Sequence, residues 1–141
     1  MLSTQYAQDE FKKLDEDADF IADRERLELL QTEGQAIIED FQKNQETLSD
    51  EEKVDMQGKL EDKQTEIQFL TQKLQNKAQE TQQAVITTLS PDFQRILGEL
   101  INAKDMDMVV TPQALFYADP DLDITDEVTA LLDVALAEKS E

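Results

Sequence analysis

The sequence predicts a mainly α-helical protein with a small β part, in which a long antiparallel coiled-coil hairpin is attached to a small body shared by several copies. Three observations predict this class. The 141 residues include only three Gly and three Pro, so few turns interrupt the chain. Apolar residues recur at helical spacing over the first 88 residues. Further on, the pattern changes to two short strands, which are too few for a stable sheet in a single copy.

The composition excludes several functional classes. Thirty-three Asp and Glu against thirteen Lys and Arg give a net charge of −20, and Cys and His are absent. Disulfides, thiolate nucleophiles, Cys/His zinc sites and imidazole bases are therefore impossible. Nucleic acid is not an expected partner, because phosphate binding depends on clusters of Lys and Arg. Direct membrane insertion is not expected either, since no apolar run approaches the ~18–20 residues of a membrane span.

The first half of the hairpin is predicted as one long helix from about Ser3 to Thr47. Apolar residues form a stripe with spacings of three and four, which is the signature of a buried helix face. The stripe slips by one position around residues 23–26, so the seam is expected to drift or the helix to kink there. The stripe consists of Ala7, Phe11, Leu14, Ala18 and Ile21, and then of Leu27, Leu30, Gly34, Ile37 and Phe41.

The second half of the hairpin is predicted to begin after a turn near residues 47–52. Ser49 followed by Glu52 is a capping box, in which each side chain bonds the backbone amide of the other residue. The returning helix has a heptad-like seam. These features together place the hairpin at residues 1–88. The seam residues are Leu60, Ile67, Leu70, Leu74, Ala78, Thr81 and Val85.

Residues 89–141 are predicted to form the oligomerisation domain together with the start of the first helix. Pro91 predicts a helix boundary or a kink, followed by a short amphipathic helix over residues 93–101. Strands are predicted at 106–110 and 114–117, and a last helix is predicted after Asp123 or Thr125 as its cap. The residues expected in the shared body are Met108, Val109, Val110, Ala114, Leu115, Phe116, Tyr117, Ile124 and Val128.

The acidic clusters do not predict a metal site or a catalytic site. Asp119, Asp121 and Asp123 have the spacing of a calcium loop, but Ile124 and Ala130 occupy positions that need Gly and Glu, so a helix-capping role is favoured. The acidic run at residues 15–19 is interpreted as a solvated helix face. A two-helix rod offers no pocket to shift a carboxylate pKa, and no Gly-rich phosphate loop is present. We therefore expect no enzyme activity and no cofactor.

Several large apolar residues lie off the predicted seams and are the candidate binding residues. One interpretation is that they widen the hairpin contact or pack against another copy. The other is that they offer another polypeptide many weak contacts. These residues are Phe20, Leu29, Ile38, Val54, Met56 and Phe69.

The C-terminal part of the sequence resembles the signature of the Skp/OmpH family of periplasmic chaperones. The resemblance is carried by residues 116–128, Phe-Tyr-Ala-Asp-Pro-Asp-Leu-Asp-Ile-Thr-Asp-Glu-Val, and is supported by residues 106–110, 114–117 and the hairpin tip at 47–52. Pro91 also lies where many members have a Pro. The resemblance spans most of the chain.

The resemblance implies a homotrimer with a β-barrel body made from three copies, and helical arms around a central cavity. It implies an ATP-independent holdase that binds unfolded outer-membrane β-barrel proteins in the periplasm. A signal peptide is absent from this sequence and is expected to have been removed. Members of the family usually have basic arms, whereas this chain is acidic, so the basic binding residues are not carried over. A coiled-coil tether with a single folded partner, and a prefoldin-like cytosolic chaperone, are the alternatives.

Overall fold

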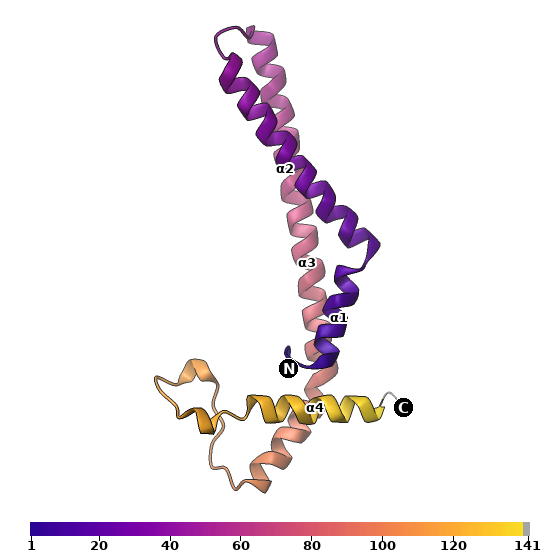
Figure 1. Ribbon diagram of the computed structural model, residues 1–141, viewed down its shortest axis with the longest axis vertical. Coiled ribbons are helices and arrows are strands. Elements are labelled where there is room, and N and C mark those ends of the chain that lie inside the picture. The colour runs from indigo at the N-terminus through magenta and orange to yellow at the C-terminus, as the bar shows by residue number, and fades with distance from the viewer. Residues whose placement is uncertain (140–141) are drawn as a thin grey trace. The chain divides into compact units, whose positions relative to one another are not determined.

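The computed structural model describes residues 1–139, and most of them lie in helices (Figure 1). The predicted mainly helical class with long helices is therefore confirmed. The described chain divides into two compact units: a hairpin unit, Lys13–Glu80, and a terminal unit, made of Met1–Lys12 and the chain from Thr81 onward. The elements are α1 (Gln5–Asp15), α2 (Ala18–Asn44), α3 (Asp50–Ala103), the 3₁₀ turns η1 (Pro112–Ala114) and η2 (Pro120–Leu122), and α4 (Thr125–Lys139).

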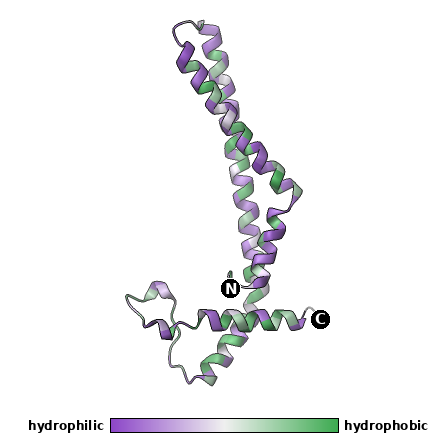
Figure 2. Cartoon of the chain, in the orientation of Figure 1, coloured by the Kyte–Doolittle hydropathy of each residue, from purple (hydrophilic) through white to green (hydrophobic). Residues whose placement is uncertain are grey.

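The hairpin unit is held by a narrow apolar seam between α2 and α3. Leu30 and Leu70 are buried, while Leu27, Ile67 and most other seam residues are only partly covered. Figure 2 shows hydrophobic and hydrophilic residues alternating along both helices, as expected of two helices that share one face. A pair of helices has little interior, so each residue of this unit buries little apolar surface.

The first predicted helix is interrupted at Glu16–Asp17, which corrects the expectation of one helix with a slip at residues 23–26. The Asp17 carboxylate accepts a hydrogen bond from the backbone N–H of Phe20 at 2.9 Å and so caps α2. This cap stabilises a new helix start at this position, because it satisfies a backbone N–H that has no partner within the helix. The break changes the phase of the helix, and Ile21, predicted in the seam, is exposed.

The turn between α2 and α3 contains the predicted capping box. The Glu52 carboxylate accepts from the Ser49 backbone N–H at 2.8 Å, and the Ser49 Oγ accepts from the Glu52 N–H at 3.3 Å. The Ser49 N–H, and the Ser49 hydroxyl at 2.8 Å, both donate to the Glu52 carboxylate, and they lower the pKa of Glu52 because they favour its charged form. The reciprocal bonds satisfy free amides at the start of α3, and this sequence-based prediction is confirmed.

The terminal unit has a true apolar core between α3 and α4. Ile96, Leu100, Val128 and Leu132 form one buried cluster. A second cluster joins Ala7 of α1 to α3, and α1 is further fixed because its Gln5 N–H donates to the Asp133 carboxylate of α4 at 2.8 Å. Three helices therefore meet here. The second cluster consists of Ala7, Val85 and Leu89, with Met1, Tyr6 and Leu136 packed against it.

Helix α3 continues through Pro91, so the predicted possibility of a helix boundary there is wrong. Pro91 removes one backbone donor. The Ser90 hydroxyl donates to the Ile86 carbonyl at 2.7 Å. Leu89 and Ile96, on either side of Pro91, are buried, and their burial stabilises an unbroken helix. Packing of the flanking residues therefore outweighs the cost of one proline.

The two predicted strands at residues 106–110 and 114–117 are not formed among residues 1–139. Helix α3 ends where Asp105 adopts a positive φ of 51°, and the Met106 N–H donates back to the Ile101 carbonyl at 3.0 Å. Between this cap and α4 the chain is irregular, apart from the turns η1 and η2. A strand needs a neighbour to bond its backbone, and the described single chain provides none at this segment.

Candidate interaction surface

Four of the six candidate binding residues are exposed on the hairpin unit. Val54 and Phe69 on α3 keep 68% and 66% of their surface accessible, and Leu29 and Ile38 on α2 are also exposed. Exposed side chains of this size do not contribute to the seam of this chain. The two helices therefore present isolated apolar side chains, each surrounded by polar residues.

The other two candidates, Phe20 and Met56, are half-buried. Phe20 lines a shallow depression together with Asp23, Lys73 and Leu74. Because Phe20 and Met56 are half-buried, the structure favours the interpretation that these two residues pack within the hairpin. The binding role of the four exposed residues remains a prediction.

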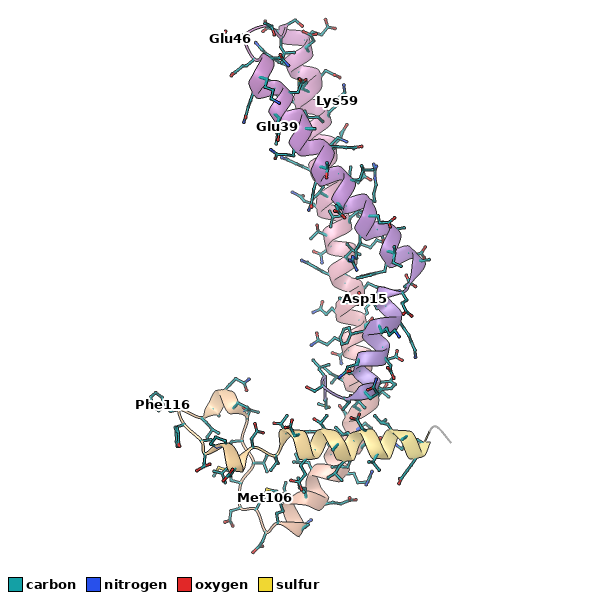
Figure 3. The ribbon with its side chains drawn as sticks, viewed as in Figure 1. Asp15, Glu39, Glu46, Lys59, Met106 and Phe116 are labelled. Atoms are coloured by element: carbon teal, nitrogen blue, oxygen red, sulfur yellow. The ribbon has the colours of Figure 1, made fainter. Side chains whose placement is uncertain are left out.

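The most exposed apolar surface of the described chain lies in residues 107–118, which we call the open segment. Met108 is 76% exposed and Tyr117 is 80% exposed, and Figure 3 shows Phe116 at the outer edge of this part of the terminal unit. Val109, Val110 and Leu115 are exposed as well. Ala114 is also exposed. Large apolar residues concentrated in one short segment favour an interaction site.

The backbone of the open segment is also poorly bonded. Within residues 1–139, the N–H and C=O groups of Asp107–Val110 and Phe116–Ala118 form no hydrogen bond with other backbone groups. The turn η1 between these stretches has two such bonds, from Ala114 to Thr111 and from Leu115 to Pro112. The open segment therefore offers both apolar side chains and free backbone groups.

Two residues predicted for the shared body lie elsewhere. Val128 belongs to the buried α3–α4 cluster, and Ile124 packs against that cluster. Their contacts are within the described chain, because α4 needs an apolar face to pack on α3. Conversely, Leu122 in η2 is exposed and was not among the candidates. In the sequence, only the two aspartates that flank Leu122 indicate that its side chain is exposed.

Ion pairs along the hairpin unit link α2 to α3. Arg26 donates two hydrogen bonds to the Glu66 carboxylate, at 2.8 and 3.0 Å, and Lys73 lies 2.6 Å from Asp23. The hydrogen bond from Arg26 lowers the pKa of Glu66. The contact with Asp23 raises the pKa of Lys73. Because the cations Arg26 and Lys73 are exposed, these pairs mainly fix the register of the two helices.

In the terminal unit, Lys139 near the end of α4 holds Asp92 of α3. Its Nζ donates to both Asp92 carboxylate oxygens, at 2.9 and 2.7 Å. Asp92 is only 5% exposed, and its pKa is lowered chiefly by this bond. Lys104, just after the end of α3, pairs with Glu127 of α4. Charge and apolar packing thus fix α4 together.

Two of the three aspartates in residues 119–123 act as caps. The Asp119 carboxylate accepts from the Asp121 N–H at 3.1 Å, and the Asp123 carboxylate accepts from the Thr125 N–H at 2.9 Å. Bonds to Thr125 lower the pKa of Asp123. The capping interpretation is confirmed. Across residues 1–139, no three acidic side chains gather in a metal-binding arrangement.

None of the helices within residues 1–139 combines the length and apolarity that crossing a membrane requires. The fold defines the class: a helical-hairpin protein with an acidic surface, isolated exposed apolar residues on the hairpin, and an apolar open segment in the terminal unit. Residues 1–132 match the family model described as "Outer membrane protein (OmpH-like)". The chain therefore belongs to the OmpH-like family, which is a family of chaperones. No curated protein and no solved structure matches the chain significantly.

Proposed function

We propose that this protein is an ATP-independent periplasmic holdase that binds unfolded outer-membrane β-barrel proteins and prevents their aggregation. In this proposal residues 1–88 form the arm, and residues 89–141 with the start of the first helix form the oligomerisation domain. Three copies share one small β-barrel body. Membership of the OmpH-like family supports the chaperone role.

The single observation that carries the trimer proposal is the open segment. Its exposed apolar side chains and unbonded backbone groups are a costly combination for a chain that remains alone. Val109 and Val110, and Phe116 and Tyr117, belong to residue types that favour strands. Strand pairing between copies would satisfy the backbone and cover the side chains in one step.

The exposed residues on the hairpin unit support the holdase role. A non-native chain has no fixed shape, so many weak contacts suit it better than one complementary pocket. Phe69, Val54, Leu29 and Ile38 provide such separate contacts, and the charged residues around them keep the hairpin hydrated.

The test combines two measurements on the full chain. Light scattering gives the mass in physiological salt, and turbidity reports aggregation when a urea-unfolded outer-membrane β-barrel protein is diluted into buffer containing the chaperone. We expect the mass of three copies and suppressed aggregation at one trimer per client. A natively folded barrel protein serves as the control and should not bind.

A single-copy mass would contradict the trimer, and unchanged client aggregation would contradict the holdase role. Stoichiometric binding of one folded partner, without capture of unfolded chains, would instead favour the tether alternative.

A further inference from the structure

We propose that the hairpin unit selects unfolded segments in which apolar residues alternate with Lys or Arg. This inference rests on the proposed holdase function and specifies its substrate class. It comes from the charges that surround the exposed apolar residues.

The hairpin unit has a strong excess of carboxylates. Residues 13–80 contain nineteen Asp and Glu but only nine Lys and Arg. Five of these nine bases already pair with carboxylates of the same unit. The paired bases are Arg24, Arg26, Lys59, Lys63 and Lys73.

The local surroundings of Val54 show the consequence. Residues three and four positions away lie beside a side chain on the same helix face. For Val54 the preceding neighbours are Asp50 and Glu51, whose side chains form no ion pair or hydrogen bond within residues 1–139. An apolar group that inserts at Val54 would therefore bring its own flanking residues close to two free carboxylates.

Leu29 lies beside a free carboxylate, whereas the charged neighbours of Phe69 on its helix face, Glu66 and Lys73, are both paired. Glu25 lies four positions before Leu29 and has no partner in the described part of the chain. The nearby cations are occupied: Arg26 bonds Glu66, and Lys73 bonds Asp23. The surface beside Leu29 thus offers free negative charge, while the cations near both residues are already neutralised. Electrostatic complementarity selects partners and speeds their encounter, so a cationic client is favoured over an anionic one.

The experiment uses two synthetic, unstructured peptides that share identical apolar residues at identical positions. Lys fills the intervening positions in one peptide, and Glu fills them in the other. Fluorescence anisotropy measures binding to the full chain. Because each exposed ion pair is weak and several act together, we expect the Lys peptide to bind about tenfold more tightly at about 20 mM salt. The preference should largely vanish at about 0.5 M salt, where charges are screened.

Two matched variants locate the effect. The hairpin triple variant Glu25→Gln, Asp50→Asn and Glu51→Gln removes the three free carboxylates. The terminal-unit triple variant Asp107→Asn, Asp126→Asn and Glu138→Gln changes the net charge equally and serves as the control. We expect only the hairpin variant to lose most of the preference, with helix content checked by circular dichroism.

The outcomes separate this inference from the function on which it rests. Equal binding of the two peptides, tighter binding of the Glu peptide, or equal effects of the two triple variants would overturn the inference while the holdase role stands. Failure to bind either peptide, together with unsuppressed aggregation of an unfolded barrel protein, would overturn both.

Discussion

The hairpin unit and the terminal unit differ in how much apolar surface they bury and in how completely their backbone groups are hydrogen-bonded. In the hairpin unit the helices satisfy almost all of their own backbone groups, but the seam is narrow and the ion pairs that link its helices each contribute little stability. In the terminal unit α1, α3 and α4 bury two apolar clusters, yet in the adjoining open segment the apolar side chains are exposed and, within residues 1–139, Asp107–Val110 and Phe116–Ala118 form no backbone–backbone hydrogen bonds.

From this difference we infer which unit depends on other molecules. A two-helix hairpin exposes its apolar residues singly, so the hairpin stays hydrated. Each exposed residue can still make a weak contact with another polypeptide. The open segment exposes them together, next to free N–H and C=O groups, and such a segment gains most from a permanent partner. We infer that the terminal unit associates with its own copies and that the hairpin binds transient clients.

The largest effect on folding is expected from Leu132→Ala in the terminal unit. Leu132 is fully buried against α3, and its truncation should lower the free energy of unfolding by about 3 kcal/mol. Leu70→Ala in the hairpin seam is the matched variant and should cost less, because a narrow seam can close around the cavity. Urea unfolding followed by circular dichroism measures both. An equal or greater loss for Leu70→Ala would contradict the contrast between the units.

The next largest effect is expected from Lys139→Met, which removes the donor to Asp92. The folded pKa of Asp92 is below its ordinary value of 3.8, so its stabilising effect is complete above that pH and is lost as the pH falls through the lower folded value. The variant loses this contribution, and acid unfolding of the terminal unit should begin at a higher pH. Lys59→Met, which breaks an exposed pair on α3, is the control. An unchanged acid midpoint for Lys139→Met would refute the role of the bond.

A smaller effect is expected from Ser49→Ala at the hairpin turn. Loss of the cap should lower stability by about 1 kcal/mol, because the amides at the start of α3 lose a partner. Thr47→Ala, in the same turn but outside the capping box, should change stability less. A thermal melt by circular dichroism distinguishes the two variants. A Ser49 variant as stable as the parent would show that the capping box adds nothing.

The smallest effect on folding is expected from Phe69→Asp. Phe69 is exposed, so helix content and mass should stay constant, whereas suppression of client aggregation should decrease. Gln68→Asp, at the neighbouring exposed position, is the control for the added charge. If helix content falls with Phe69→Asp, the residue packs rather than binds.

Some local features of the fold were predictable from sequence, and the long-range ones were not. The capping box at Ser49 and Glu52 is formed by residues three apart, so the sequence alone identifies it. The break at Asp17 was missed because an aspartate in an acidic run fits a solvated helix face as well as a cap. The continuous helix at Pro91 depends on burial of Leu89 and Ile96, which no local pattern reveals.

The candidate surface was predictable only in part. The off-seam positions of Val54 and Phe69 follow from helical periodicity, and both are exposed. Phe20 and Met56 are half-buried, which periodicity does not reveal, because their burial depends on the register of the two helices. The strand pattern near Val109 and Val110 does not form a strand in the single chain, since a strand takes its hydrogen bonds from a neighbour.

Hydrogen exchange of the open-segment amides, measured over a range of protein concentrations, is the most direct test of whether copies of this chain pair through that segment. The amides of Asp107–Val110 and Phe116–Ala118 should exchange slowly at high concentration and become unprotected on dilution, in parallel with loss of the assembled mass. Fast exchange of these amides at every concentration would contradict pairing between copies.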